Sequence, residues 1–344
     1  MLNNKIPNGI VSSVKLELKT FYENFPYKNL PFDQKPFALT IKNGFSCYNK
    51  IINNDGKEVK FIPEIYYDWY KKRVISKEPK NFNKKNIKHF KGTVITFIKA
   101  FPNNYFHWLM DIFPTFNIID LLNIKEKVKI HLDLNKQYKK EHIKHLGYSS
   151  GDVIDYRKYP CISADKLIFI YVGSRYYDWS KNYIRNSLIN CCKRKRNNRR
   201  IYISRSDSPT YPQGGNMTTR KVQNEDELIK FLKTYGFEVY TLSGKSLKEQ
   251  VRLFSESNVM IMPHGAGMIN NHFCSSKTMI IQLWSPLSWK SPAHQSPVQY
   301  KTYNNNVRIV NFMGKDYNTL EINGNMIIDI KKLERFFKII GIHK

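Results

Sequence analysis

The feature of this sequence that most restricts its fold is a regular alternation of strand-like and helix-like segments between residues 200 and 284. Short apolar runs, typical of strands buried on both faces, alternate with longer segments whose apolar residues recur at helical spacing. The four strand-like runs cover residues 200–204, 237–242, 259–263 and 279–284. Because strands separated by helices are normally joined by crossovers, this stretch predicts a parallel, Rossmann-like sheet.

The helices of this half have recognisable ends. Asn224 and Gly236 bracket the first helix as an N-cap and a C-terminal glycine. Ser246 and Glu249 form a capping box that opens the second helix. Residues 329–341 carry the same kinds of signal at both ends of a last helix. These ends support the assignment of the segments between the strands as helices.

The first half of the chain shows a similar alternation. Strands are expected at 92–98, 128–132, 152–156 and 166–172, and helices at 105–122 and 139–146. A chain of 344 residues is long for a single core, so two α/β domains are expected. We place the first domain at residues 1–180, the second at 181–325, and a final helix within 326–344 that packs back on the first domain.

A glycine-rich corner, His264-Gly265-Ala266-Gly267, follows the strand-like run 259–263. Glycine has no Cβ, so backbone N–H groups at such a corner can approach a ligand closely. A glycine turn between the end of a parallel strand and the start of a helix is a place where proteins hold a diphosphate. The alternative is a strand-to-helix turn that binds nothing.

His107 and Asp111 lie four residues apart in the helix expected after strand 92–98, so they share one helix face. An imidazole and a carboxylate in this arrangement can form a couple for proton transfer. The alternative is a histidine that is hydrogen-bonded in the core, beside a carboxylate that the dipole favours near a helix start.

The charge of the chain points to an anionic partner. Lys and Arg total 56 against 28 Asp and Glu, which gives a formal net charge of +28. Nucleic acid, a phosphorylated substrate and an anionic membrane surface all fit such a balance, and so does a composition rich in solvated lysine. The basic run at 193–200 is either a patch for nucleic acid or lipid, or a solvated connector. It contains no aromatic residue, which weakens a role in stacking on single strands.

The five cysteines show neither a CxxC pair nor a Cys/His spacing typical of metal sites. We therefore expect free thiols, no bound metal, and a reducing compartment, which makes the predicted location cytoplasmic. The first residues lack the apolar core of a signal peptide, and no apolar run approaches the ~20 residues of a spanning helix. At most, the protein is expected to lie on a membrane as a peripheral protein.

Three blocks of sequence carry a resemblance to a known family. The first, at 104–111, reads Asn-Tyr-Phe-His-Trp-Leu-Met-Asp. The second runs from the Tyr-Ile-Ser-Arg segment at 202–205 through Arg220 to residue 254, and the third is the corner with its flanks at 263–273. In this order and spacing, which spans roughly residues 92–285, the blocks resemble glycosyltransferase family 61.

This resemblance implies an inverting glycosyltransferase of GT-B architecture, with two Rossmann-like domains facing a cleft. It implies a nucleotide-sugar donor held by the second domain, with a UDP-linked sugar as the leading choice, and neither a cofactor nor an obligatory metal. The acceptor is expected to be a glycan or a lipid-linked molecule, as in polysaccharide biosynthesis. An anionic membrane surface is a further candidate partner, and nucleic acid is not expected. The alternatives are a basic nucleic-acid-binding protein and a non-catalytic glycosyltransferase-like scaffold.

The resemblance also assigns roles to residues. Arg205 and Arg220 would face the donor diphosphate, since a guanidinium fork matches phosphate geometry. His107 or Asp111 would be the base that deprotonates the acceptor hydroxyl. The other expected donor-binding residues are Asn224, Glu225, His264, Gly265, Ala266, Gly267, Asn270 and Gln282. Gln282 departs from the family, which often carries an acidic residue there, and the donor identity depends on this position.

Overall fold

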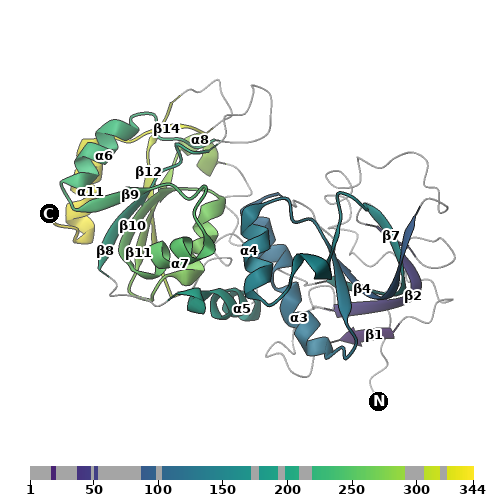
Figure 1. Ribbon diagram of the computed structural model, residues 1–344. Helices are drawn as coiled ribbons and strands as arrows, with labels where there is room; N and C mark the ends of the chain where they lie inside the picture. The colour runs from purple at the N-terminus through teal and green to yellow at the C-terminus, as the bar shows by residue number, and fades with distance from the viewer. Residues whose placement is uncertain are drawn as a thin grey trace, which may run out of the picture. The chain divides into compact units, whose positions relative to one another are not determined.

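The computed structural model describes residues 17–20, 37–47, 50–52, 87–97, 103–171, 178–192, 198–208, 219–290, 306–317 and 324–344. The chain forms two compact units, Met1–Ile184 and Arg185–Lys344, and each has its own sheet (Figure 1). Both units combine helices with parallel strands, which confirms the predicted α/β class.

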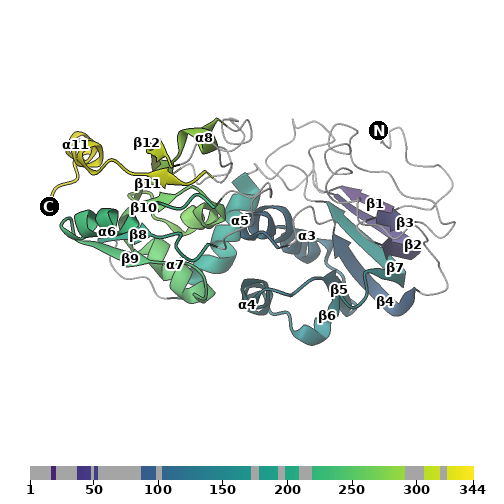
Figure 2. The same ribbon diagram turned by 90° about the horizontal axis from the view of Figure 1, so that it is seen from above.

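The sheet of the first unit is mixed. Its strands are β1 (Glu17–Thr20), β2 (Phe37–Cys47), β3 (Lys50–Ile52), β4 (Lys88–Phe97), β5 (Val128–Leu132), β6 (Val153–Asp155) and β7 (Cys161–Tyr171). They follow the order β1-β2-β7-β4-β5-β6, with β3 paired to β2 (Figure 2). The run β7-β4-β5-β6 is parallel, whereas β2 pairs antiparallel with β7, β1 and β3.

The main sheet of the second unit is entirely parallel, as the sequence predicts. Its strands are β8 (Arg199–Ile203), β9 (Phe237–Tyr240), β10 (Ser257–Pro263), β11 (Met279–Trp284) and β12 (Arg308–Met313). Their order is β12-β11-β10-β8-β9, so the chain leaves β8 toward one side and β10 toward the other. The neighbours β8 and β10 therefore define the switch point of a doubly wound sheet. A separate pair, β13 (Lys315–Asp316) and β14 (Met326–Ile327), is antiparallel.

The helices connect these strands and several have the ends expected from sequence. They are α2 (Tyr105–His107), the π-turn η4 (Trp108–Ile112), α3 (Thr115–Leu122), α4 (Gln137–His145), η5 (Ser150–Asp152), α5 (Asp178–Leu188), η6 (Ile189–Cys191), α6 (Glu225–Lys233), α7 (Leu247–Ser255), η7 (Ala266–Phe273), α8 (Pro286–Trp289) and α11 (Ile330–Ile340). The capping box of Ser246 and Glu249 forms at α7, and Asp329 caps α11 through the backbone N–H of Lys332. Among these described helices, none has both the length and the apolar character to cross a bilayer.

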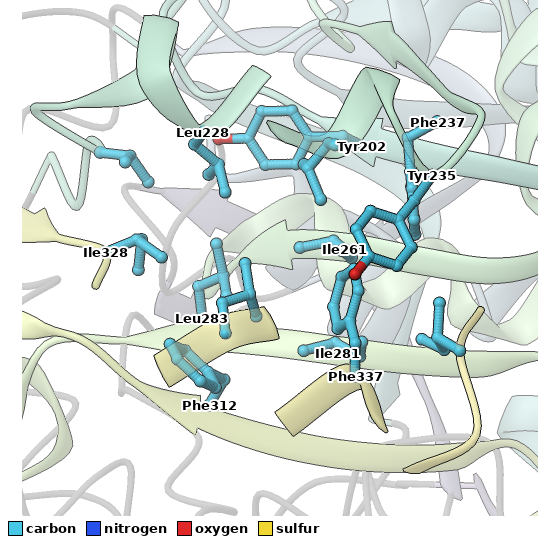
Figure 3. Packing of buried hydrophobic residues seen from close by; sticks show 14 of the residues in the cluster. Tyr202, Leu228, Tyr235, Phe237, Ile261, Ile281, Leu283, Phe312, Ile328 and Phe337 are labelled. Carbon is cyan, nitrogen blue, oxygen red and sulfur yellow. The ribbon is translucent and has the colours of Figure 1, made fainter. Parts of the chain in front are cut away.

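One core cluster of the second unit lies on the face of the sheet that α6 and α11 cover (Figure 3). The ring of Phe337 on α11 contacts Tyr235 and Phe237, with centroids 5.0 and 6.0 Å away. We expected the last helix to pack back on the N-terminal domain. Its buried residues Leu333 and Phe337 instead belong to the core of the second unit, because their apolar stripe meets aromatic partners there.

The expectation that all cysteines are free thiols is wrong. Cys47 and Cys161 form a disulfide between β2 and β7, where the two residues are directly opposite each other in the antiparallel pair. Cys191, Cys192 and Cys274 are free. The bonded pair is separated by 114 residues, so the pairing depends on the order of the strands rather than on any local motif.

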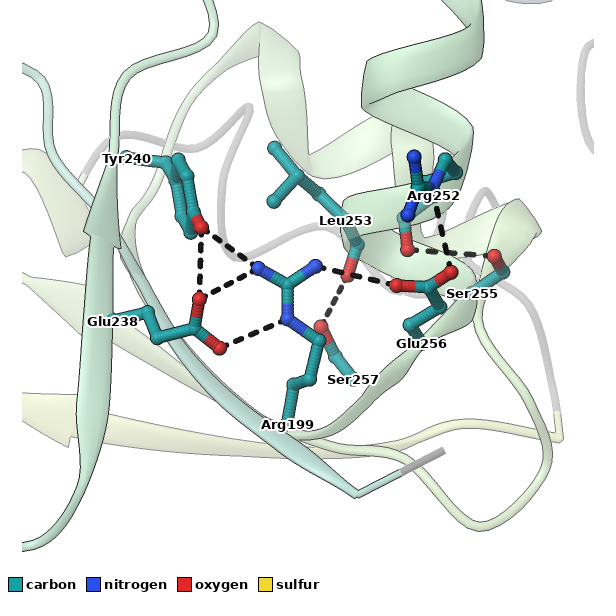
Figure 4. Close-up of polar contacts among 8 residues, drawn as sticks. All are labelled: Arg199, Glu238, Tyr240, Arg252, Leu253, Ser255, Glu256 and Ser257. Atoms are coloured by element: carbon teal, nitrogen blue, oxygen red, sulfur yellow. Dashed lines mark hydrogen bonds and ion pairs between the residues drawn. The ribbon is translucent and has the colours of Figure 1, made fainter. Parts of the chain in front are cut away.

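A polar network links the start of β8 with β9 and with the residue before β10 (Figure 4). The Arg199 guanidinium donates to both carboxylate oxygens of Glu238, from Nε at 2.9 Å and from Nη2 at 2.7 Å. It also donates to the Tyr240 hydroxyl at 2.8 Å and to Glu256 at 3.3 Å. The hydrogen bonds from Arg199 are the main cause that lowers the pKa of Glu238 to about 2.

This network predicts a pH-dependent contribution to stability. Because the folded-state pKa of Glu238 lies below its unfolded value of about 4.3, the contribution is complete above that value and is lost as the pH falls toward 2. Glu238→Gln should therefore lower the unfolding midpoint in urea more at pH 7 than at pH 3. Arg199→Gln should weaken the same pH dependence, since it removes the donor. An equal effect of Glu238→Gln at both pH values would contradict this assignment.

Candidate functional site

The ends of β8 and β10 bring the predicted donor residues to one edge of the second sheet. Arg205 follows β8, and His264 and Gly265 follow β10, its parallel neighbour. In doubly wound sheets, ligands bind at the carboxyl ends of the strands where the chain changes direction. The switch point of this sheet is therefore occupied by an arginine and a glycine corner.

Arg205 passes directly over Gly265. A Cβ at position 265 would lie 1.9 Å from Nη1 of Arg205, so any other residue there would force this guanidinium to move. Nε of Arg205 donates to the carbonyl oxygen of Thr219 at 3.0 Å. The arginine is thus fixed between the corner and the residue that precedes Arg220.

The backbone at Arg220 is unusual and is held on both sides. Arg220 has φ of 51°, in the left-handed region that non-glycine residues seldom adopt. The side-chain oxygen of Asn325 accepts hydrogen bonds from the Thr219 hydroxyl at 2.5 Å and from the Lys221 N–H at 2.8 Å. Asn325 therefore holds the turn that contains Arg220, and no sequence motif predicts this role.

His264 lies between two side chains of β11. Its ring stacks on Trp284, with centroids 3.9 Å apart and 17° between the planes, and the Gln282 amide nitrogen donates to its Nδ1 at 2.5 Å. Both His264 and Gln282 are buried. The amide at the position where the family often has an acid is thus in contact with the corner histidine. The stacking role of Trp284 was not anticipated from sequence.

The remaining residues of the third sequence block begin η7. Ala266 is its first residue, and a Cβ on Gly267 would come closest to the side-chain end of Leu242, at 2.6 Å. Asn270 is fully buried, and its amide donates to Gln250 of α7 at 2.9 Å. Asn270 therefore ties η7 to α7 in the structure.

Asn224 and Glu225 make hydrogen bonds that connect the start of α6 to neighbouring segments, including the end of β8. The Glu225 carboxylate accepts from the Tyr202 hydroxyl at 2.6 Å and from Ser204 at 3.0 Å, immediately before Arg205. Asn224 occupies the N-cap position of α6, but its side chain makes no capping bond. Its amide instead pairs with the backbone N–H and carbonyl of Ile328, at 2.9 and 2.8 Å.

His107 and Asp111 are in contact in the first unit. His107 Nδ1 lies 2.6 Å from the Asp111 carboxylate, and both side chains are partly exposed. The Asn104 side chain accepts from the backbone N–H groups of Phe106 and His107 and so caps the start of α2. When Nδ1–H donates to the carboxylate, Nε2 carries the lone pair and can accept a proton.

The predicted continuous helix over 105–122 is interrupted. The turn from Trp108 to Ile112 is a π-helix, and Pro114 precedes a separate helix, α3. π-turns within helices occur frequently at functional sites. Here the turn contains Asp111 and begins directly after His107.

The π-turn is anchored by a buried histidine that sequence reasoning missed. The Trp108 indole N–H donates to Nδ1 of His142 on α4 at 3.0 Å, and both rings are buried. Burial is the main cause that lowers the pKa of His142 to about 3, with a smaller repulsion from His145. His142 thus stays neutral near pH 7 and keeps its lone pair for Trp108.

Two further expectations concern metals and the basic run. No group of three or more His, Cys, Asp or Glu suited to hold a metal ion exists among the residues that the structure describes. Residues 193–197 of the basic run lie outside the described residues. Arg199 belongs to the network above, and Arg200 donates to the carbonyl oxygens of Tyr235 and His343 at 2.8 and 2.6 Å. These two arginines therefore make hydrogen bonds within the second unit that stabilise its fold.

The buried state of His142 predicts a second pH dependence. Its folded-state pKa of about 3 lies below the unfolded value of about 6.5, so the unfolded chain binds a proton first and stability falls as the pH drops between these values. His142→Gln should remove a slope of up to about 1.4 kcal/mol per pH unit in the free energy of unfolding. His145→Gln, an exposed position on the same helix, is the matched control and should keep most of it. Equal slopes in wild type and His142→Gln would refute the assignment.

Comparison with known families agrees with this geometry. A family model described as Glycosyltransferase 61 matches residues 105–281, which is slightly more than half of the chain. The matched range contains the His107–Asp111 pair, both arginines and the glycine corner. No curated protein matches the sequence. The chain belongs to glycosyltransferase family 61.

Proposed function

We propose that this protein is an inverting glycosyltransferase that moves a sugar from a nucleotide-sugar donor, with UDP as the leading nucleotide, to a hydroxyl acceptor on a glycan or lipid-linked molecule. Family membership supports the reaction class. The observation that carries the donor assignment is Arg205 lying over Gly265 at the switch point of the second sheet. The proposal includes the GT-B architecture that the family resemblance implies.

In this proposal the second unit binds the donor diphosphate. The planar forks of Arg205 and Arg220 donate to phosphate oxygens, and the glycine corner lets backbone N–H groups approach them. As the bond between the anomeric carbon and the diphosphate oxygen breaks, negative charge grows on that oxygen. Fixed guanidinium groups stabilise this charge without a metal ion. The contact of Arg205 with Thr219 supports the role, because it limits the motion of the fork.

The first unit supplies the base. Inversion needs a single displacement, in which the acceptor oxygen bonds to the anomeric carbon while the diphosphate leaves. We assign the acceptor proton to Nε2 of His107, and Asp111 holds the ring and stabilises the imidazolium that results. The contact of 2.6 Å between His107 and Asp111 supports this division of roles over Asp111 as the base.

We also propose a cellular compartment for the protein. The cysteine spacing, which contains no CxxC pair and no metal-site pattern, predicts free thiols and therefore the reducing cytoplasm. Disulfides persist mainly in oxidising compartments, so the bond between Cys47 and Cys161 favours such a compartment instead.

Gly265→Ala tests the donor site. The added Cβ cannot coexist with Nη1 of Arg205, so the guanidinium must move and a charged hydrogen bond to phosphate is lost. We expect affinity for a nucleoside diphosphate to fall roughly 10- to 100-fold by calorimetry with UDP, GDP and CDP. Gly151→Ala in the first unit is the control, because its added Cβ would meet only the Ser149 hydroxyl oxygen, at 3.6 Å. Undiminished binding in Gly265→Ala, or no binding of any of the three by wild type, would sink the assignment.

His107→Ala tests the base. We expect kcat to fall by about 10²–10⁴ while donor affinity stays unchanged, because the imidazole acts on the acceptor. Asp111→Asn should also lower kcat, since the ring of His107 loses the carboxylate that holds it. Donor hydrolysis or transfer assays over pH 5–9 measure both effects. A His107→Ala protein with full activity would instead favour another base, and an inactive wild type with intact donor binding would favour the scaffold alternative.

A further inference from the structure

Helix α11 presents a surface that none of the assigned roles uses. Its buried residues Leu333 and Phe337 fix which side faces the core of the second unit. The outward residues are Lys331, Lys332, Arg335, Lys338 and Ile339, all exposed. At 3.6 residues per turn these five positions fall within about 120° of the helix circumference. We call them the α11 face. Figures 1 and 2 show α11 next to the C-terminus, at the margin of its unit.

Two properties distinguish the α11 face. All four of its charged side chains are cationic, and Ile339 is 81% exposed, more than any other large hydrophobic residue in the described part of the chain. The adjacent helix α6 also exposes lysines, but it exposes Asp226 and Glu227 beside them. A lysine-rich composition alone therefore does not explain the purely cationic charge of the α11 face, because α6 of the same unit exposes charges of both signs.

The two acidic groups near the α11 face, Asp329 and Glu334, also interact with residues outside it. Asp329 caps the helix through the N–H of Lys332 and lies 4.0 Å from Lys315 Nζ. Glu334, on the flank of the helix, hydrogen-bonds with Tyr235. Asp329 also attracts Arg335, so these two carboxylates offset only part of the charge of the four cations and the face keeps a positive excess.

We propose that the α11 face docks the protein on an anionic lipid bilayer. Lysine and arginine side chains are attracted to anionic headgroups, and a protruding aliphatic side chain can enter the boundary between headgroups and acyl chains. Because the apolar stripe of α11 lies in the core, the attachment is mainly electrostatic, and Ile339 is its one apolar contact from the face. Nucleic acid would also attract the cations, but single strands bind proteins largely through bases that stack on aromatic side chains, and the α11 face has no aromatic residue.

The test is sedimentation of the full chain with vesicles of phosphatidylcholine, with and without 30% phosphatidylserine. The face variant is K331Q/K332Q/R335Q/K338Q. The matched control is K230Q/K233Q/K248Q/K277Q, four exposed lysines elsewhere in the second unit, with the same change in net charge. We expect wild type and control to bind only the phosphatidylserine vesicles, with binding that weakens as NaCl rises. The face variant should bind at least about tenfold more weakly. Ile339→Asn should weaken binding further at high salt.

Several outcomes would overturn the proposal. Equal losses in the face and control variants would show that net charge alone attracts the protein. Binding without a preference for phosphatidylserine would exclude headgroup recognition. If duplex DNA bound through the same four cations while Ile339→Asn left vesicle binding unchanged, the face would belong to nucleic acid. No donor is present in this assay, so its failure is separate from failure of the proposed enzymatic function.

Discussion

The parallel pairing of β8 with β10 is the constraint on which the second unit depends. β9 comes between them in the chain but lies on the outer side of β8, so the connections from β8 and β10 diverge. Only this arrangement places the residue after β8 beside the corner after β10. Arg205 and Gly265, which are 60 positions apart in sequence, then meet so closely that a methyl group on residue 265 would displace the guanidinium.

The contacts around this meeting point show how the site is supported. Glu225 joins the start of α6 to the end of β8 through Tyr202 and Ser204. Asn325 holds both neighbours of Arg220. Preorganised groups stabilise developing charge better than mobile ones, because they need no rearrangement during the reaction. The polar residues behind the arginines thus contribute by restricting them, without any need to touch the ligand.

Much of this framework was predictable from local sequence. β5 and β11 have the bounds that their apolar runs indicate, and the capping box at Ser246 forms as written in the sequence. The features that escaped prediction depend on partners far along the chain. His142 accepts a hydrogen bond from Trp108, which lies 34 positions earlier in the chain, and Leu333 of α11 is buried in the core of the second unit. No local pattern encodes which apolar stripe or acceptor a residue will meet after folding.

The disulfide between β2 and β7 has a topological consequence. It closes a covalent ring that includes β4, β5 and β6 and the turn carrying His107. In the chain-entropy account, a ring of this size removes several kcal/mol of freedom from the unfolded ensemble, about 4.7 for a loop of 100 residues. The ring also makes the first unit tolerant of backbone cleavage. A single cut between positions 47 and 161 would leave both fragments joined until the sulfur–sulfur bond is reduced.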